Sequence, residues 1–489
     1  MTDYPSSLAG LPVCVAGLGI SGPPAARVLA ELGAQVTAVD ARDDAERRAL
    51  ADKLAGHGVR VLLGAGATTS VPAATKLVVT SPGWQPDAPL LAAAVGAGIE
   101  VICDTELAWR LRPRLPGEGG PGVPRQRWLA VTGTNGKTTT VRMLALILDA
   151  AGLRAIAAGN VGTSLMDVVT EPEPYEVVAV ELSSYQLHWS STIAPMAAAV
   201  LNVAAHHLDW HGSLDAYAAA KAKILAPGTI AIGNADDLRS AAMVAAAHDA
   251  GLAPRAVRFR LGQPGPGELG VAGGYLLDRA FGTPAEVAAG IPLAELAEVF
   301  ASPPAPHNVA NALAAAALAR AYGVAAAAVG AGLAAFRPEP HRMALVASLA
   351  GVDYVDDSKA TNPHAAAAAL GAYRRVVWIA GGLLKGAESD LGELVRGAAP
   401  RLRGVVLLGA DRDKFAAALE RHAPQVPVVQ VAGTDTGTMD VAVDAAWRMA
   451  EPGDTVLLAP AAQSFDLFRD YPARGDAFAS HVRRLEARQ

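Results

Sequence analysis

The stretch that decides the fold is residues 128–140, Trp-Leu-Ala-Val-Thr-Gly-Thr-Asn-Gly-Lys-Thr-Thr-Thr. An apolar run passes into a loop of small residues and then into an amphipathic segment, residues 141–150, so we predict a strand, a phosphate loop and a helix. Small residues let backbone N–H groups turn toward phosphate oxygens, and the helix N-terminus adds its positive dipole end. The candidate residues for a nucleoside triphosphate are Gly133, Thr134, Asn135, Gly136, Lys137, Thr138 and Thr139.

Two side chains of this loop carry most of the expected chemistry. Lys137 is placed to reach the terminal phosphates, and the hydroxyl of Thr138 is a candidate ligand of Mg²⁺. The loop departs from the common pattern at Val131, where glycine is usual. The alternative is a glycine turn that binds nothing, but the strand-to-helix context favours a nucleoside triphosphate site.

Length and composition set the class of protein. A chain of 489 residues predicts roughly three domains. With 52% hydrophobic and 18% charged residues it is typical of an ordinary globular protein. The net charge of -6, without a basic tail, argues against a nucleic-acid partner. No apolar run approaches the ~20 residues that span a bilayer, so we expect no membrane span.

The cysteine count and the N-terminus indicate the compartment. Cys14 and Cys103 are the only cysteines, and both lie in strand-like runs where a buried, reduced thiol is expected. The first residues lack a cationic lead that would indicate export. We therefore expect a cytoplasmic protein.

The N-terminal part reads as a Rossmann-like domain. A short apolar run, 12–16, leads into the glycine pattern of residues 17–22, and a second run, 35–40, ends at Asp40. This pattern favours a dinucleotide over a nucleotide sugar, and a purely structural turn remains an alternative. Further strands are expected at 59–63, 77–80 and 100–103, and the segment rich in proline and glycine at 112–125 reads as a linker.

The middle part places polar residues after its expected strands. Glu181 lies near the end of the apolar run 177–184, and the strand 197–203 leads to four potential metal ligands: His206, His207, Asp209 and His211. A histidine-rich surface turn is the alternative to a metal site. After a phosphate loop we favour one imidazole and nearby carboxylates on Mg²⁺. A helix at 214–225 carries Lys221, and Asn308 and Asn311 open an alanine-rich helix.

The last part again alternates strands and helices. Strands are expected at 351–357, 375–382, 405–408 and 455–458. Candidate ligand residues follow these strands, where α/β sheets bind ligands. They are Asp357, Lys359, Thr361, Lys385, Ser464 and Phe465.

Together these motifs resemble the Mur ligases of peptidoglycan precursor synthesis, and among them the members that add D-glutamate. The resemblance covers essentially the whole chain. It is carried by residues 17–22, 81–83, 133–139, 159–162, 181–184, 221–224, 307–311, 341–342, 357–362, 464–468 and 474–475. It implies an α/β fold of three domains: a Rossmann-like domain at 1–115, a P-loop ATPase-like domain at 116–337 and a C-terminal Rossmann-like domain at 338–489.

The resemblance implies a reaction that joins UDP-N-acetylmuramoyl-L-alanine to D-glutamate with hydrolysis of ATP, by way of an acyl phosphate. It also replaces the dinucleotide expectation for the first domain with a uridine-nucleotide site. The implied contacts of the nucleotide sugar are Ile20, Ser21, Asp40, Gly83 and Asn160.

The same resemblance assigns the remaining roles. Lys137, Glu181, His207 and Lys221 are the implied catalytic residues, and Thr138, Glu181, His207 and Lys221 surround Mg²⁺, with Lys221 as a carbamate. Asn308, Asn311, Arg342 and Asp357 would complete the ATP site. The implied D-glutamate residues are Lys359, Thr361, Lys385, Ser464, Phe465 and Tyr471.

Two positions depart from the family pattern. Tyr471 replaces a phenylalanine in the amino-acid pocket, and His206 replaces the aspartate usual before the metal-site histidine. A ligase for another amino acid, such as L-glutamate, and a non-catalytic nucleotide-binding regulator remain as alternatives. We expect small-molecule substrates and a monomer.

Overall fold

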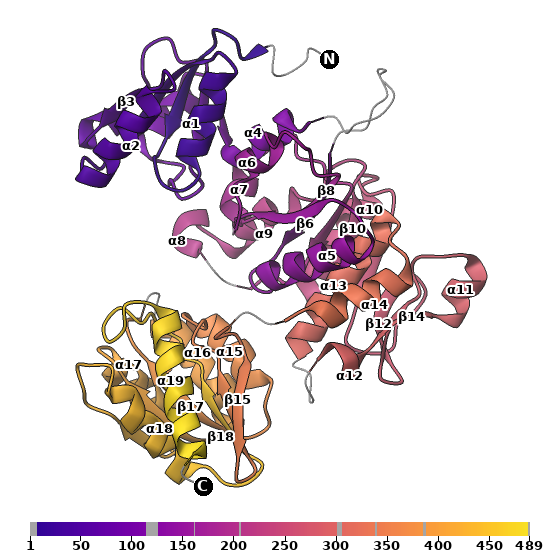
Figure 1. The fold of residues 1–489 in the computed structure, drawn as a ribbon, viewed down its shortest axis with the longest axis vertical. Helices are drawn as coiled ribbons and strands as arrows, with labels where there is room; N and C mark the ends of the chain where they lie inside the picture. The colour runs from indigo at the N-terminus through magenta and orange to yellow at the C-terminus, as the bar shows by residue number, and fades with distance from the viewer. Residues whose placement is uncertain are drawn as a thin grey trace. The chain divides into compact units, whose positions relative to one another are not determined.

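The computed structural model describes residues 7–113, 126–160, 162–204, 207–300, 306–337, 340–384 and 388–487, without the side chains of 209, 364 and 388–390. The chain forms two compact units, Met1–Phe336 and Arg337–Gln489 (Figure 1). The first unit contains two sheets and the second contains one. All but the first two residues of the expected linker, 112–125, lie outside the described residues.

The N-terminal sheet has five parallel strands in the order β3-β2-β1-β4-β5. Its strands are β1 (Pro12–Ala16), β2 (Gln35–Asp40), β3 (Arg60–Leu63), β4 (Leu77–Thr80) and β5 (Glu100–Cys103). Its helices are α1 (Gly22–Glu31), α2 (Ala45–Ala55), α3 (Pro89–Gly96) and α4 (Asp104–Leu111). The Rossmann-like expectation for this part is confirmed.

The glycine pattern after β1 is required by packing. Gly17 has φ of 97°, and a Cβ there would lie 2.7 Å from the Trp84 Nε1 atom and 2.8 Å from the Ser81 hydroxyl oxygen. A Cβ on Gly22 would lie 1.8 Å from the carbonyl oxygen of Gly17. Only glycine therefore lets the turn close against the loop after β4.

The central sheet has nine strands in the order β14-β13-β12-β11-β10-β9-β6-β8-β7. They are β6 (Arg127–Thr132), β7 (Ala155–Gly159), β8 (Val177–Glu181), β9 (Ala197–Val200), β10 (Ile230–Asn234), β11 (Ala256–Phe259), β12 (Glu268–Ala272), β13 (Tyr275–Asp278) and β14 (Ile291–Glu295). Strand β13 is antiparallel to its two neighbours, β12 and β14, and all other neighbouring strands in this order are parallel. Val131 pairs with Glu181, and Thr132 pairs with Val200, so these strands end at one edge of the sheet.

The helices of this part are α5 (Lys137–Ala150), α6 (Leu165–Val169), α7 (Ser184–His188), α8 (Leu208–His211), α9 (Leu214–Ala222), α10 (Leu238–Asp249), α11 (Pro284–Ala289), α12 (Leu296–Val299), α13 (Pro306–Tyr322) and α14 (Ala326–Ala335). Helices α5 and α13 both pack on the sheet, and α5 also packs against α13 and α14, with which it shares one apolar core (Figure 1). A Cβ on Gly332 would lie 2.4 Å from the Ile147 Cα atom, so α14 packs directly on the backbone of α5. The phosphate-loop helix thus buries one face, from Thr139 to Leu148, in this core.

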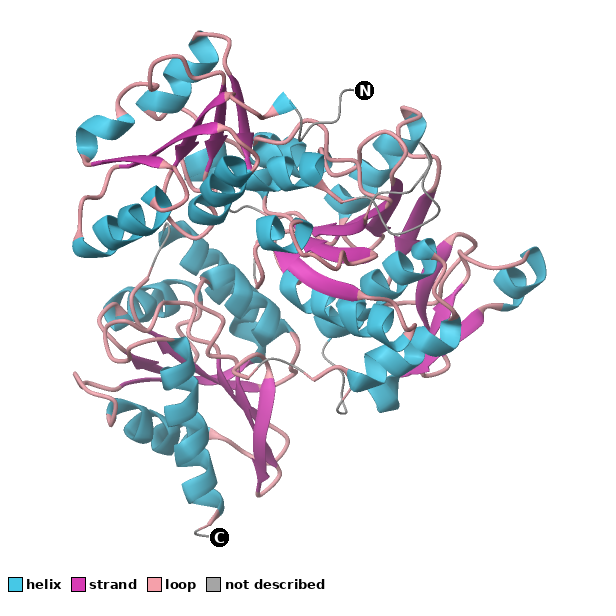
Figure 2. Ribbon diagram, turned by 45° about the horizontal axis from the view of Figure 1, so that its top comes forward, coloured by secondary structure: helices cyan, strands magenta, loops and turns pink. Residues whose placement is uncertain are grey.

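The second unit has a six-stranded sheet in the order β15-β16-β20-β17-β18-β19. Its strands are β15 (Ala344–Leu349), β16 (Val352–Asp356), β17 (Val376–Gly381), β18 (Leu402–Leu408), β19 (Val428–Gln430) and β20 (Thr455–Leu458). Helices α15 (Pro363–Gly371), α16 (Glu388–Ala398) and α17 (Arg412–His422) share a core on one face. Helices α18 (Thr438–Met449) and α19 (Tyr471–Glu486) cover the other face (Figure 2).

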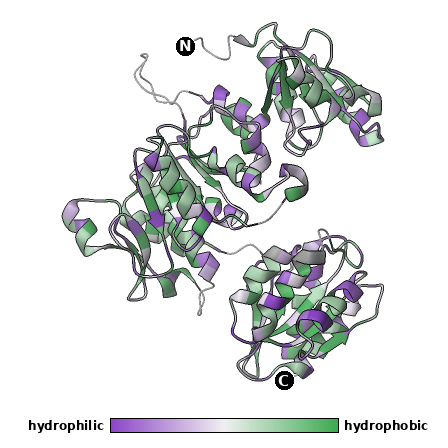
Figure 3. Cartoon of the chain, turned by 180° about the vertical axis from the view of Figure 1, so that it is seen from behind, coloured by the Kyte–Doolittle hydropathy of each residue, from purple (hydrophilic) through white to green (hydrophobic). Residues whose placement is uncertain are grey.

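Figure 3 shows the strands of these sheets as predominantly hydrophobic, whereas hydrophilic residues lie mainly on the helices and loops. This is the pattern of parallel sheets that helices cover on both faces. The expected α/β class with three domains is confirmed. Among the described residues, no helix is both long enough and apolar enough to cross a membrane.

Candidate active site

The phosphate loop joins β6 to α5 and is held closed by its own lysine. Gly136 has φ of 85°, and the helix begins at the next residue. The Lys137 ammonium donates hydrogen bonds to the carbonyl oxygens of Gly133 and Thr134, both at 3.0 Å. The Thr140 hydroxyl donates to the Gly136 carbonyl at 2.9 Å. The loop therefore folds back over the Lys137 ammonium. A phosphate group bound in the loop would replace the two carbonyl oxygens as the partner of this ammonium.

Asn202, which the sequence analysis missed, holds the loop from the end of β9. Its side-chain oxygen accepts from the Asn135 N–H at 2.8 Å, and its amide donates to the Asn135 carbonyl at 3.1 Å. Next to it, the Thr134 hydroxyl lies 3.1 Å from the Tyr217 hydroxyl. The sequence feature that could have identified Asn202 is its position after an apolar strand, because polar residues at strand ends lie near the phosphate loop.

Glu181 lies at the end of β8 and is only 1% exposed. Its two carboxylate oxygens have different partners. The Thr138 hydroxyl donates to Oε2 at 2.8 Å, and the Asn160 amide donates to Oε1 at 3.1 Å. The structure thus brings together Thr138, Asn160 and Glu181, which the sequence places far apart.

Lys221 is buried beneath the same loop with 1% of its surface exposed. Its ammonium donates to the Gly133 carbonyl at 2.8 Å and lies 4.5 Å from the centre of the Tyr217 ring. Burial, and then the charge of Lys137, hold the pKa of Lys221 well below its usual range, while Glu181 opposes the shift. Desolvation is the main cause because a buried ammonium loses its hydration.

His207 precedes the short helix α8 and has φ of 56°, in the left-handed region. Its ring lies 4.8 Å from the Tyr185 ring, which also lies 4.7 Å from the Trp210 ring. His211 lies 3.0 Å from the Ser184 hydroxyl. His206 and the Asp209 side chain fall outside the described residues.

The expected nucleotide-sugar residues lie at the glycine turn of the N-terminal sheet. Ile20 is 93% exposed, and the Ser21 hydroxyl lies 3.5 Å from the Ser81 hydroxyl. The Asp40 carboxylate accepts from the Leu18 N–H at 2.7 Å. Asp40 also binds the backbone of Arg42 and lies 3.5 Å from the Arg47 guanidinium, so protein groups hold this carboxylate.

Gly83 has free space around it, whereas the asparagines of α13 are partly or fully buried. Apart from its chain neighbours, no atom of the described residues lies within 4 Å of a Cβ built on Gly83, so a ligand has room there. Asn311 is 5% exposed, and its side-chain oxygen lies 2.3 Å from a Cβ built on Gly136. Asn308 is half-buried in the first turn of α13. Asn311 therefore packs directly on the phosphate loop.

In the second unit, Asp357 follows β16 and accepts from the Met343 N–H at 3.1 Å. Burial raises the pKa of Asp357 to about 7, against the opposing effects of that hydrogen bond and of Arg342. The Lys359 ammonium lies 5.6 Å from the centre of the Tyr471 ring. These expected ligand residues therefore gather at the end of β16.

The remaining expected residues of this unit differ in exposure. Ser464 is 3% exposed, whereas Phe465 presents 64% of its surface to solvent. Thr361 is half-buried, and its N–H donates to the Lys359 carbonyl. Lys385 lies outside the described residues.

Arg474 supports this loop from α19, a role that its sequence motif alone did not reveal. It is 1% exposed and donates to the Ser358 hydroxyl at 3.0 Å and to the Ser358 carbonyl at 2.8 Å. It also donates to the Ala462 carbonyl at 3.0 Å. One buried guanidinium thus ties together the loops after β16 and β20.

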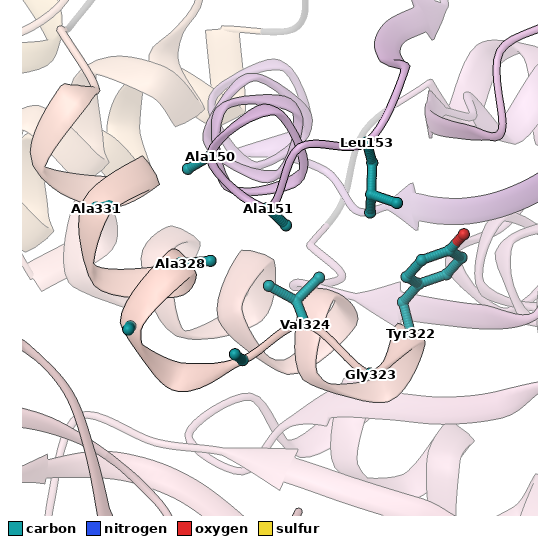
Figure 4. A pocket seen from close by; sticks show the side chains of 10 residues that line it. Ala150, Ala151, Leu153, Tyr322, Gly323, Val324, Ala328 and Ala331 are labelled. Atoms are coloured by element: carbon teal, nitrogen blue, oxygen red, sulfur yellow. The ribbon is translucent and has the colours of Figure 1, made fainter.

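A cavity of about 630 Å³ lies away from the phosphate loop. It lies at the other end of α5, between that end and the turn that joins α13 to α14 (Figure 4). Alanine side chains, Leu153, Tyr322 and Val324 line it, and no ionisable group except the Tyr322 phenol is among them. We assign it no catalytic role.

Three family models match successive parts of the chain, in the same order as the three sheets. Residues 12–103 match the MurD-like N-terminal domain of Mur ligases, residues 131–319 the Mur ligase middle domain and residues 341–462 the Mur ligase glutamate ligase domain. The chain belongs to the Mur ligase family.

Curated relatives narrow this class. The chain is 58% identical over 482 residues to a protein of Thermobifida fusca named UDP-N-acetylmuramoylalanine--D-glutamate ligase, covering 98% of this chain and 99% of that protein. A protein of the same name from Mycolicibacterium smegmatis is 47% identical, with 99% of each chain covered. A solved structure of a pseudomurein peptide ligase type C from Methanothermus fervidus matches with a TM-score of 0.52 at 17% identity over 98% of this chain and 99% of that chain. The last comparison supports the fold alone.

Proposed function

We propose that this protein joins the amino group of D-glutamate to the carboxylate of UDP-N-acetylmuramoyl-L-alanine, with hydrolysis of ATP to ADP and phosphate. The observation that carries the proposal is the meeting of Lys137, Glu181 and Lys221 at the carboxyl edge of the central sheet, around a phosphate loop. The names of the relatives at 58% and 47% identity supply the two substrates.

The reaction needs activation because a carboxylate is a poor electrophile. In the proposed reaction, a carboxylate oxygen of UDP-N-acetylmuramoyl-L-alanine attacks the γ-phosphorus of ATP. The bond between this phosphorus and the bridging oxygen of ADP breaks, and an acyl phosphate forms. The D-glutamate nitrogen then attacks the acyl carbon, loses a proton and expels phosphate. Such transfers depend mainly on positioning and charge neutralisation, which the Lys137 ammonium provides at the loop.

The residues present fit a magnesium ion. Mg²⁺ prefers oxygen ligands and keeps several waters and substrate phosphates, so it does not require a cage of protein carboxylates. Thr138 and Glu181 offer two oxygen donors 2.8 Å apart, and we propose His207 and Lys221 as the further metal residues. When bound, Mg²⁺ would neutralise phosphate charge. The described residues contain no converging group of three His, Cys, Asp or Glu side chains.

We propose that Lys221 acts as a carbamate. The ammonium first loses a proton to water, and the neutral amine then attacks the carbon of CO2. An N–C bond forms, one C–O π bond opens to give the carboxylate, and the nitrogen loses a second proton to water, so that a cation becomes an anion. The lowered pKa of Lys221 supports this because burial beside Lys137 favours the neutral amine. The inversion of charge would also remove the repulsion between two neighbouring lysines.

Labelling tests the carbamate directly. With ¹³C-bicarbonate, wild-type protein should show one carbamate carbon signal in NMR, which Lys221→Ala should lack and Lys53→Ala, a change on the exposed face of α2, should keep. Lys221→Ala should also lower turnover at least about 100-fold, as loss of a transition-state charge contact typically does. An active wild-type protein without the signal would contradict the carbamate.

The substrate contacts are part of the proposal. Ile20, Ser21, Asp40, Gly83 and Asn160 hold the nucleotide sugar, and Asn308, Asn311, Arg342 and Asp357 hold ATP with the phosphate loop. Lys359, Thr361, Lys385, Ser464, Phe465 and Tyr471 receive D-glutamate, whose two carboxylates suit lysine and hydroxyl donors. We also propose that the protein works as a monomer in the cytoplasm.

An amino-acid panel tests the function. With UDP-N-acetylmuramoyl-L-alanine, ATP and Mg²⁺, phosphate release should require D-glutamate and should not be supported by L-glutamate or D-aspartate. Mass spectrometry should find the product one glutamate residue heavier than the nucleotide sugar. Phosphate release that does not depend on D-glutamate would overturn the proposal, and faster release with L-glutamate would favour the related ligase.

A further inference from the structure

Two tryptophans connect the glycine turn of the N-terminal sheet to the segment that carries His207. The Trp210 indole N–H donates to the backbone carbonyl of Trp84 at 3.2 Å, and Trp210 is 8% exposed. Trp84 directly follows Gly83, and Trp210 lies in the short helix that begins after His207. This hydrogen bond is therefore a direct link between two parts of the first unit.

On one side of the link, Trp84 lies against the turn proposed to bind the nucleotide sugar. A Cβ on Gly17 would lie 2.7 Å from the Trp84 Nε1 atom, so the indole lies directly on this glycine. The Ser81 hydroxyl, from the same loop as Trp84, donates to the Gly17 carbonyl at 3.2 Å. A ligand that orders the turn therefore also restricts Trp84.

On the other side, the Trp210 ring packs into an aromatic cluster around the metal-site segment. Its centre lies 4.7 Å from that of Tyr185, and the Tyr185 ring in turn lies 4.8 Å from the His207 ring. Tyr185 lies in α7, which follows the strand ending at Glu181. The backbone of His207 lies in the left-handed region, which is sterically unfavourable for a residue with a side chain. Contacts with neighbouring residues must therefore stabilise this conformation.

We propose that Trp210 is a positioning residue that couples binding of the nucleotide sugar at the glycine turn to the placement of His207 for the metal. The inference rests on the proposed function, because it concerns the same two sites. Coupling between two binding sites is reciprocal. If bound nucleotide sugar raises the affinity for the metal–nucleotide complex by some factor, the bound metal–nucleotide complex raises the affinity for nucleotide sugar by the same factor. Trp210 does not itself touch the reacting groups.

The chain offers a matched pair of variants. Trp210→Phe removes the N–H donor and keeps an aromatic ring against Tyr185. Trp189→Phe removes an indole N–H that has no hydrogen-bond partner among the described residues. Both variants therefore lose the same group from neighbouring parts of the chain, but only one of them breaks the link.

The experiment measures Mn²⁺·ADP binding by calorimetry with and without UDP-N-acetylmuramoyl-L-alanine, which needs no turnover. Wild type and Trp189→Phe should bind Mn²⁺·ADP about five- to tenfold more tightly when nucleotide sugar is present, as expected for one hydrogen bond. Trp210→Phe should lose most of this factor while it keeps its affinity for Mn²⁺·ADP alone. In turnover it should lower kcat more than it raises the KM of nucleotide sugar.

Two results would overturn the inference: a wild-type protein without coupling, or a Trp210→Phe variant that couples like wild type. A Trp189→Phe variant that loses the coupling equally would also contradict it, because any change in the aromatic cluster would then have the same effect. Failure of the proposed function is distinct. It would appear as the absence of phosphate release dependent on D-glutamate in wild type, whatever the binding experiment gives.

Discussion

At the scale of single residues, the phosphate loop depends on one backbone conformation and one neighbour. Gly136 combines a φ of 85° with a close contact, since a Cβ there would lie 2.3 Å from the Asn311 side-chain oxygen. A side chain at this position would be strained and would also displace an asparagine proposed to hold ATP. Both effects arise at the residue directly before the first residue of α5.

Gly136→Ala should lower the free energy of unfolding by about 2 to 4 kcal/mol, through strain and overpacking, and should weaken ATP binding. Gly152→Ala is the control, because Gly152 has φ of 75° but the described residues place no atom within 4 Å of the added Cβ. It should cost only about 1 kcal/mol and leave ATP binding unchanged. Urea unfolding and calorimetry measure the two quantities. Equal losses in both variants would contradict the role of Asn311.

A second residue-scale consequence concerns Asp104, at the start of α4. Burial raises the pKa of this carboxyl to about 6, and no group in the described part of the chain forms a hydrogen bond with Oδ1. At pH values between the pKa of Asp104 in the unfolded chain, about 4, and its pKa in the folded protein, the carboxyl is protonated only in the folded state. The contribution of Asp104 to stability is therefore present at low pH, falls as the pH rises from about 4 to 6, and then stays constant.

Asp104→Asn should remove this dependence. Between pH 4.5 and 6, the free energy of unfolding of the variant should fall less steeply with pH than that of wild type, by up to about 1.4 kcal/mol per pH unit. Above pH 6.5 the two curves should run parallel. Urea unfolding at a series of pH values measures both slopes, and identical slopes from pH 4.5 to 6 would show that Asp104 does not titrate in this range.

At the scale of elements, the Glu106 carboxylate connects helix α4 to the loop after α7 through hydrogen bonds. Glu106 is fully buried and accepts from the backbone N–H groups of Ser191 and Thr192, both at 3.1 Å, and from the Thr192 hydroxyl. The Arg110 guanidinium lies 2.8 Å from it. The N-terminal and central sheets are thus joined by a compact polar network as well as by apolar packing.

Glu106→Gln should lower the free energy of unfolding by about 3 kcal/mol, because an amide N–H₂ would face hydrogen-bond donors and Arg110 would lose a buried partner. Glu100→Gln is the control, since Glu100 binds the same arginine at 2.7 Å but is 53% exposed. It should cost less than about 1 kcal/mol. A comparable loss in both variants, measured by urea unfolding, would show that the network contributes little.

The elements that sequence reasoning found are those with strong patterns. The buried runs at Val177–Glu181 and Thr455–Leu458 were predicted to within a few residues, because parallel strands covered on both faces are continuously apolar. The strands β7, β12, β14, β15 and β19 were not predicted. They are at or near the edges of their sheets, where Glu268 and Gln430 interrupt the apolar pattern.

The candidate site was predictable where a motif marks it. Lys137 and Thr138 follow from the loop, whereas Lys221 was assigned only through the resemblance, since the burial of one helix lysine has no local signal. Asn202 and Trp210 were missed because each acts through a partner distant in sequence, Asn135 and Trp84 respectively. Such contacts depend on sheet order, which spacing alone does not determine.

At the scale of the whole molecule, the chain divides between Phe336 and Arg337. The second unit has apolar cores on both faces of its own sheet, one built around Trp378 and the other around Tyr354 and Phe478. A unit of this size with two internal cores has what a domain needs to fold alone. The boundary between the two sheets of the first unit has no comparable division.

The isolated segment 337–489 should therefore fold by itself. It should show α/β circular dichroism and a single cooperative urea transition, as small single domains usually do. A segment cut within the first unit, residues 126–336, is the comparison. It loses Glu106 and the contacts of α4, so it should be less stable than the same region in the full chain. An unfolded 337–489 segment would contradict the division.

Ile20 has a thermodynamic consequence for the glycine turn. A large aliphatic side chain with 93% of its surface in water is unusual in a chain that buries most of its isoleucines, and it lies beside the turn proposed to hold the nucleotide sugar. If a ligand covers it, apolar surface leaves water on binding, which gives a negative change in heat capacity. The binding enthalpy would then become more favourable as temperature rises, and Ile20→Ser would flatten that temperature dependence.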